Sequence, residues 1–137
     1  MDHRLSNRFL RLAVLFALIG MGLGYWMGAT EQFAAAPVHA HINLLGWVSM
    51  ALYGLFYRVQ PGAAQGWLPA LHFWVAVVGL LIFMPALAAK LLSGPDLQAF
   101  ANTGLVVGPS LTLLSMVLFV GIVFRATGPR AVDPHPQ

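Results

Sequence analysis

The chain has 137 residues, of which 59% are hydrophobic and only 8% are charged. Soluble domains carry roughly 25% charged residues, so this composition excludes a soluble globular enzyme and indicates an integral membrane protein. The sequence contains no cysteine, which excludes disulfides, thiolate-held zinc and iron–sulfur clusters. The formal net charge is +3, but the basic residues are spread among apolar blocks and form no patch for nucleic acid.

Four apolar blocks follow one another, each close to the roughly 20 residues that span a bilayer as a helix. The expected helices run over residues 9–29, 38–59, 67–92 and 103–124, with short connectors rich in Pro, Gly and polar residues between them. The first block lacks a clear cleavage site, so we expect a retained helix rather than a signal peptide. The sequence therefore predicts an all-α, integral membrane four-helix bundle over residues 1–125, followed by a disordered cytoplasmic tail over residues 126–137.

Arginines mark one side of the predicted bundle. With four spans, both termini and the middle connector share a side, which holds Arg4, Arg8, Arg11, Arg58, Arg125 and Arg130. Lys90, Glu31 and Asp96 fall on the other side. The positive-inside rule then predicts that both termini are cytoplasmic, in a bacterial inner membrane. Aromatic residues near predicted helix ends are expected at the membrane interface; these are Tyr25, Trp26, Tyr53, Tyr57 and Trp67.

Histidines inside predicted spans are the first candidates for function, because ionisable side chains are costly there. His39 and His41 lie at the start of the second helix and His72 lies early in the third. An α-helix turns by about 100° per residue, so His39 and His41 point to nearly opposite faces and do not chelate one small ion by themselves. His72 is expected near the opposite membrane face, about 20 Å away, so it cannot be the second axial ligand of a haem bound at His39 or His41. Its role is structural or interfacial, or that of a separate metal ligand.

The two histidines define two different faces of the second helix. His39 shares its side with Asn43, Gly46, Met50 and Tyr53, whereas His41 shares its side with Leu45, Val48, Leu52 and Leu55. A flat, apolar macrocycle held through iron by an imidazole would suit either face, and Gly46 would allow its close approach. The expected cofactor-binding residues are therefore His39, His41, Asn43, Gly46 and Met50. The alternative is that both histidines simply hydrogen-bond headgroups, water or a neighbouring helix.

Several motifs together resemble a known family. They are His39-Ala40-His41, the helix end Tyr53-Gly54-Leu55-Phe56-Tyr57, the stretch Leu71-His72-Phe73-Trp74, Phe83-Met84-Pro85, and the connector Ser93-Gly94-Pro95. Their order and spacing over residues 37–125 resemble the last three helices of subunit I of the haem–copper oxygen and nitric oxide reductases. The resemblance implies that His39 matches the ligand of the high-spin haem and His41 the ligand of the low-spin haem. It thus implies a small haem protein, of b-type cytochrome character, for electron transfer or for haem or gas binding.

The resemblance also has clear departures. The copper-ligating histidines of that family, its cross-linked tyrosine, the other axial histidine and the proton-channel carboxylates lie in earlier helices that have no counterpart in this sequence. Glu31 and Asp96 both fall outside the predicted spans. These departures imply that this chain alone does not carry out proton-pumping oxygen reduction, and we expect no catalytic residue.

A single four-helix chain buries little of a haem, so we expect a homo-oligomer in which two copies share the haem, and a respiratory-chain partner. The sixth iron ligand would come from a second copy, from Met27 or from a diatomic gas, and Gly20, Gly24 and Gly28 would mediate a close helix contact between copies. Two alternatives remain open. One is a copper site of His39 and His41 with Met27 or Met50, since imidazole and thioether ligands suit copper. The other is an accessory or assembly subunit that packs against a respiratory oxidase without any cofactor.

Overall fold

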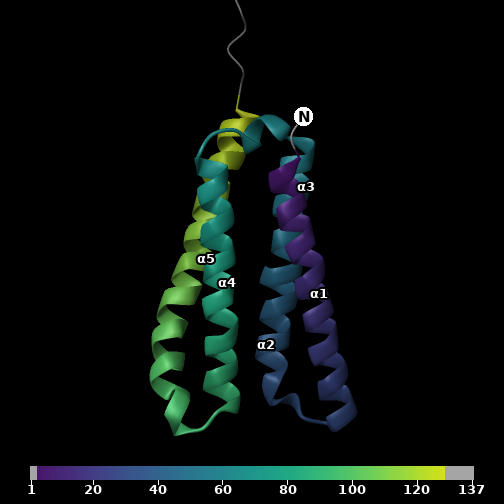
Figure 1. Ribbon diagram of the computed structural model, residues 1–137, viewed down its shortest axis with the longest axis vertical. Helices are drawn as coiled ribbons and strands as arrows, with labels where there is room; N and C mark the ends of the chain where they lie inside the picture. The colour runs from purple at the N-terminus through teal and green to yellow at the C-terminus, as the bar shows by residue number, and fades with distance from the viewer. Residues whose placement is uncertain (1–2, 129–137) are drawn as a thin grey trace, which may run out of the picture.

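The computed structural model describes residues 3–128, which are all-helical and form two antiparallel hairpins (Figure 1). The first hairpin pairs α1 (Arg4–Thr30) with a helix made of α2 (Ala36–His41), the π-helical segment η2 (Ile42–Ser49) and α3 (Met50–Val59). The second pairs α4 (Leu68–Leu92) with α5 (Gln98–Thr127). The short 3₁₀ turns η1 (Phe33–Ala35), η3 (Pro61–Ala64) and η4 (Pro95–Leu97) lie in the connectors. The predicted four-helix, all-α architecture is confirmed.

The first and last helices extend beyond the apolar blocks from which they were predicted. α1 begins at Arg4 rather than at residue 9, and α5 runs from Gln98 to Thr127 rather than over residues 103–124. Hydropathy marks only the apolar part of a helix, whereas polar residues at its ends keep the same backbone conformation. The expected tail therefore starts with helical residues, and its remainder, residues 129–137, lies outside the described residues.

Within residues 3–128, three helical stretches are long and apolar enough to cross a membrane: α1, α4 and the stretch Pro95–Thr127. The remaining helix spans Ala36–Val59 and is interrupted by the π-helical segment η2. The start of α1 and the end of α5 lie at the same end of the molecule, which we call the arginine end after Arg4, Arg8, Arg11, Arg58 and Arg125 (Figure 1).

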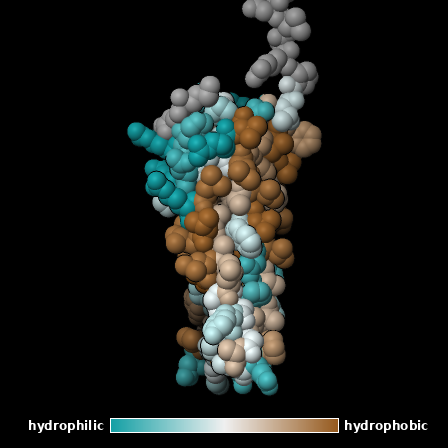
Figure 2. All heavy atoms as spheres, turned by 90° about the vertical axis from the view of Figure 1, so that its right-hand side faces the viewer, coloured by the Kyte–Doolittle hydropathy of each residue, from teal (hydrophilic) through white to brown (hydrophobic). Residues whose placement is uncertain are grey.

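Large apolar side chains cover the outside of the bundle. Figure 2 shows hydrophobic side chains along much of the α1 side, with hydrophilic ones mostly at the two ends and a smaller group between them. All four tryptophans, Trp26, Trp47, Trp67 and Trp74, are exposed at the surface of the chain. Such extensive exposure of apolar groups is what lipid tolerates and water does not.

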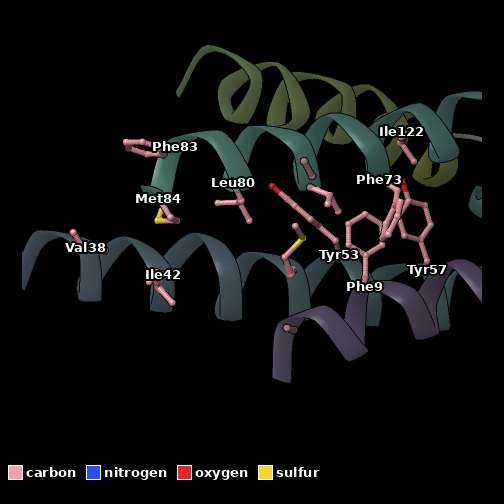
Figure 3. Close-up of a cluster of buried hydrophobic side chains, with 14 residues drawn as sticks. Phe9, Val38, Ile42, Tyr53, Tyr57, Phe73, Leu80, Phe83, Met84 and Ile122 are labelled. Carbon is pink, nitrogen blue, oxygen red and sulfur yellow. The ribbon is translucent and has the colours of Figure 1, made fainter. Parts of the chain in front are cut away.

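Aromatic side chains form the core where the two hairpins meet near the arginine end (Figure 3). Phe9 of α1, Tyr53 and Tyr57 of α3, Phe73 of α4 and Phe119 of α5 converge there, with Phe9 wholly buried. The prediction that Tyr53 and Tyr57 anchor the membrane interface is wrong, because they are only 5% and 1% exposed. Both rings face the neighbouring helices and not the surroundings.

α4 and α5 pack backbone to backbone within the second hairpin. A Cβ atom on Gly108 would lie 2.6 Å from the Cα of Phe83, a distance that real side chains do not adopt. Glycine at this position therefore allows the two helices to approach more closely than any larger residue would permit.

Candidate functional site

His39 is held in a notch on α1. Its Nδ1 lies 2.9 Å from the backbone oxygen of Gly20. A carbonyl oxygen can only accept, so Nδ1 carries the proton and donates, which fixes the tautomer of the ring. Space for the imidazole comes from Gly24, where an added Cβ would lie 2.7 Å from the Cε1 atom of His39. The half-buried ring of His39 is thus part of the contact between α1 and α2.

Asn43 completes this contact. Its Nδ2 donates to the backbone oxygen of His39 at 2.8 Å, and its side chain occupies the space where Gly20 has no Cβ. The expectation that Gly20 and Gly24 mediate contact between copies is wrong, because both are covered by side chains of the same chain. Gly28 alone of the three has open space at its Cβ position.

His41 points to the other hairpin. Its ring lies edge-on to Phe83 of α4, with centroids 5.2 Å apart, and it is half-buried. Its Nδ1 donates to the backbone oxygen of Pro37 at 2.7 Å, so the second ring nitrogen, Nε2, carries a free lone pair. No group among residues 3–128 hydrogen-bonds that Nε2. His39 and His41 therefore face different neighbours.

The π-helical segment follows directly after His41. In a π-helix each backbone N–H reaches one residue further back than in an α-helix, so one extra residue fits into the turn. Two side chains bond carbonyls along this stretch: the Asn43 amide bonds His39, and the Ser49 hydroxyl donates to the Leu44 oxygen at 2.9 Å. A widened turn beside candidate ligands is a feature often found at functional sites.

The remaining candidate residues, in this helix and in α1, lie away from the surface. Gly46 is buried against Phe16 of α1, whose ring would meet any added Cβ at 2.7 Å. Met50 is fully buried in the core, and Met27 is 5% exposed near the end of α1. The space beside Gly46 is therefore filled by the chain itself, and the thioethers of both methionines are enclosed by protein.

His72 lies in the aromatic core and not at the membrane interface. It is 0% exposed and its ring stacks on Phe119, with a centroid distance of 5.4 Å. The Nδ1 atom forms a hydrogen bond of 2.9 Å with the hydroxyl of Tyr57, whereas Nε2 is buried without a partner. The interfacial alternative for His72 is wrong, and its structural role is evident from these contacts.

This His72–Tyr57 pair could not be identified from the sequence. The only signal was the presence of a histidine in an apolar helix and of a tyrosine in the preceding helix, without any indication that the two meet. Figure 3 shows Tyr57 and Phe73 far along the bundle from Val38 and Ile42, which flank the His39–His41 motif. His72 is thus well separated from that motif.

The arrangement offers single imidazole ligands rather than a chelating cluster. Residues 3–128 contain no group of three or more His, Cys, Asp or Glu side chains that could hold a metal ion. A metal with its own equatorial ligands, such as haem iron, needs only one or two axial groups from the protein. No family model, no curated protein and no solved structure matches this chain.

Proposed function

We propose that this chain is a membrane haem protein of b-type character, with His41 as an axial ligand of the iron, acting in electron transfer or in haem or gas binding. The observation that carries this proposal is the hydrogen bond from His41 Nδ1 to the Pro37 oxygen at 2.7 Å. Histidines that bind metals commonly donate their other ring N–H to a backbone carbonyl, which fixes the tautomer and raises the basicity of the ligating nitrogen. When bound, haem iron supplies one-electron chemistry or a site for a diatomic gas.

His41 suits this role better than His39. Nε2 of His41 has no hydrogen-bond partner within residues 3–128, and its half-buried ring lies beside Phe83. The His39 ring is instead enclosed by Gly24 and lies 3.4–3.5 Å from the Asn43 amide nitrogen. His39 therefore forms part of the α1–α2 contact, although a backbone carbonyl also accepts a hydrogen bond from its Nδ1.

The apolar outer face next to His41 supports the same proposal. Leu44, Val48 and Leu52 are exposed on this helix, so a porphyrin ligated at His41 has aliphatic side chains to pack against. One chain would cover only part of such a macrocycle, which favours a shared site between two copies in the membrane. This arrangement also fits the resemblance to subunit I of the haem–copper reductases, in which His41 matches a haem ligand.

The proposal is tested by absorbance spectra of the purified protein after expression with added haem, oxidised and then reduced with dithionite. We expect a Soret band, and sharp α and β bands on reduction. His41→Ala should abolish the Soret band, because it removes the ligating nitrogen. His39→Ala is the matched control and should retain the band, since it removes a histidine with the same kind of Nδ1 hydrogen bond only two residues away.

Two results would overturn the proposal. One is a colourless protein after expression with haem. The other is copper in place of iron in an elemental analysis of the same sample, which would favour the copper alternative. A Soret band that survives in His41→Ala but disappears in His39→Ala would instead move the axial ligand to His39.

A further inference from the structure

We propose that a cavity at the arginine end binds the phosphate headgroup of an anionic phospholipid. The cavity has a volume of about 510 Å³ and lies between the first two turns of α1 and the connector from α3 to α4. Arg4 and Arg8 line it from α1, and Gly62, Gln65 and Ala70 line it from the connector and α4. This volume falls within the roughly 300–1,000 Å³ range of small-molecule sites.

The charge of the cavity selects for an anion. Arg8 is exposed and makes no hydrogen bond or ion pair with the described residues, so its guanidinium is available to a ligand. All the described charged side chains at this end are arginines, whereas Glu31 and Asp96 both lie at the opposite end. A guanidinium binds phosphate oxygens in a bidentate manner, which makes phosphate a fitting ligand.

The position of the cavity favours a lipid over a free phosphate. Leu5 and Ala70 add apolar lining beside the arginines, and the exposed ring of Trp67 stands next to the same connector. Tryptophan is enriched at the headgroup level of membranes, and basic pockets between helices on the cytoplasmic side are typical headgroup sites. A phospholipid can place its phosphate at the arginines and its glycerol and upper chains along the apolar lining.

Binding is measured on the full chain in dodecyl maltoside, titrated with dioctanoyl phosphatidylglycerol, with dioctanoyl phosphatidylcholine and with inorganic phosphate. We expect saturable binding of phosphatidylglycerol and weaker binding of the other two. Arg8→Gln should weaken phosphatidylglycerol binding about fivefold, because one arginine near an anionic lipid surface contributes about 1 kcal/mol. Arg11→Gln removes the same charge from the next turn of α1, outside the cavity lining, and should leave binding within about twofold of the unmodified chain.

A second pair of variants leaves every arginine in place. Gly62 lines the cavity, and no heavy atom lies within 4 Å of its Cβ position, so Gly62→Glu puts a carboxylate there without a steric clash. We expect this variant to lose phosphatidylglycerol binding by repulsion. Gly28→Glu is the control, because Gly28 is equally open but lies at the opposite end of α1.

Three outcomes would overturn the inference. Equal losses in Arg8→Gln and Arg11→Gln would mean diffuse surface charge rather than a site. Unchanged binding in Gly62→Glu would exclude the cavity as the location. Inorganic phosphate that binds as tightly as phosphatidylglycerol would identify a free anion as the ligand. None of these outcomes depends on whether His41 binds haem.

Discussion

At the scale of single residues, His39, His41 and His72 differ in the surroundings of Nε2, the ring nitrogen farther from the backbone. In His39 and His41 a backbone carbonyl accepts the hydrogen bond from Nδ1, so Nε2 is the ring nitrogen that keeps its lone pair. In His72 the Tyr57 hydroxyl bonds Nδ1, and Nε2 is buried without a partner in the aromatic core. Sequence reasoning separated His39 from His41 correctly, because helix geometry alone sets their directions. It could not place His72, because its surroundings come from three other helices.

The Tyr57–His72 hydrogen bond leads to a prediction about stability. Tyr57→Phe would leave both ring nitrogens of a fully buried histidine unpaired, which costs about 1–3 kcal/mol. We expect a lower midpoint of thermal unfolding in detergent, followed by circular dichroism. Tyr25→Phe removes the same hydroxyl from a side chain that is 81% exposed and serves as the control. Equal midpoints for the two variants would show that the buried hydrogen bond contributes nothing.

At the scale of elements, hydropathy was sufficient to find all four helices, because each of them contains a long apolar run. Hydropathy could not indicate the π-helical segment, which differs from an α-helix by one residue in its backbone hydrogen bonding. The side chains of Asn43 and Ser49 bond backbone carbonyls along this stretch. Nor could hydropathy tell what Gly20 and Gly24 contact, since a stripe of small residues has the same sequence pattern whether it packs against its own chain or against another. The structure places His39 and Asn43 on that stripe.

Because Gly24 leaves space for a neighbouring side chain, we expect even a small substitution there to change the stability of the protein. Gly24→Ala would place a methyl group 2.7 Å from the His39 ring, and overpacking of this kind costs about 1–3 kcal/mol. In Gly22→Ala the new methyl group meets no atom within 4 Å, and alanine is the better helix former by about 1 kcal/mol. Thermal unfolding in detergent should therefore separate the two variants in opposite directions. A Gly24→Ala protein as stable as Gly22→Ala would contradict the described α1–α2 contact.

At the scale of the whole molecule, the charges divide between the two ends of the bundle. The described arginines lie at one end, and Lys90, Glu31 and Asp96 lie at the other. Between the ends, the outward surface is dominated by exposed apolar side chains, including Leu18, Leu52, Leu81 and Val106. An arrangement with arginines at one end and an apolar middle is typical of a membrane protein with its basic end in the cytoplasm.

This division predicts a membrane topology that labelling can test. The chain has no cysteine, so single cysteines can be introduced at Gln32 and Gln65, which are both exposed and lie at opposite ends. In intact bacterial cells we expect a membrane-impermeant maleimide to label Gln32→Cys at once. Gln65→Cys should react only after the membrane is permeabilised. Labelling of both positions before permeabilisation, or of Gln65→Cys alone, would contradict the expected orientation.

The outward position of all four tryptophans has a consequence for how the protein can be observed. Trp26, Trp47, Trp67 and Trp74 all lie at the surface, whereas the buried aromatic core is built from Phe, Tyr and His. Intrinsic fluorescence therefore reports what surrounds the chain, detergent or lipid, rather than its core. Trp67 and Trp74 stand toward the arginine end, Trp47 near the middle and Trp26 at the far end. The emission of the chain is thus a sum over three positions along the bundle, and a variant that keeps a single tryptophan would report the polarity around one of them.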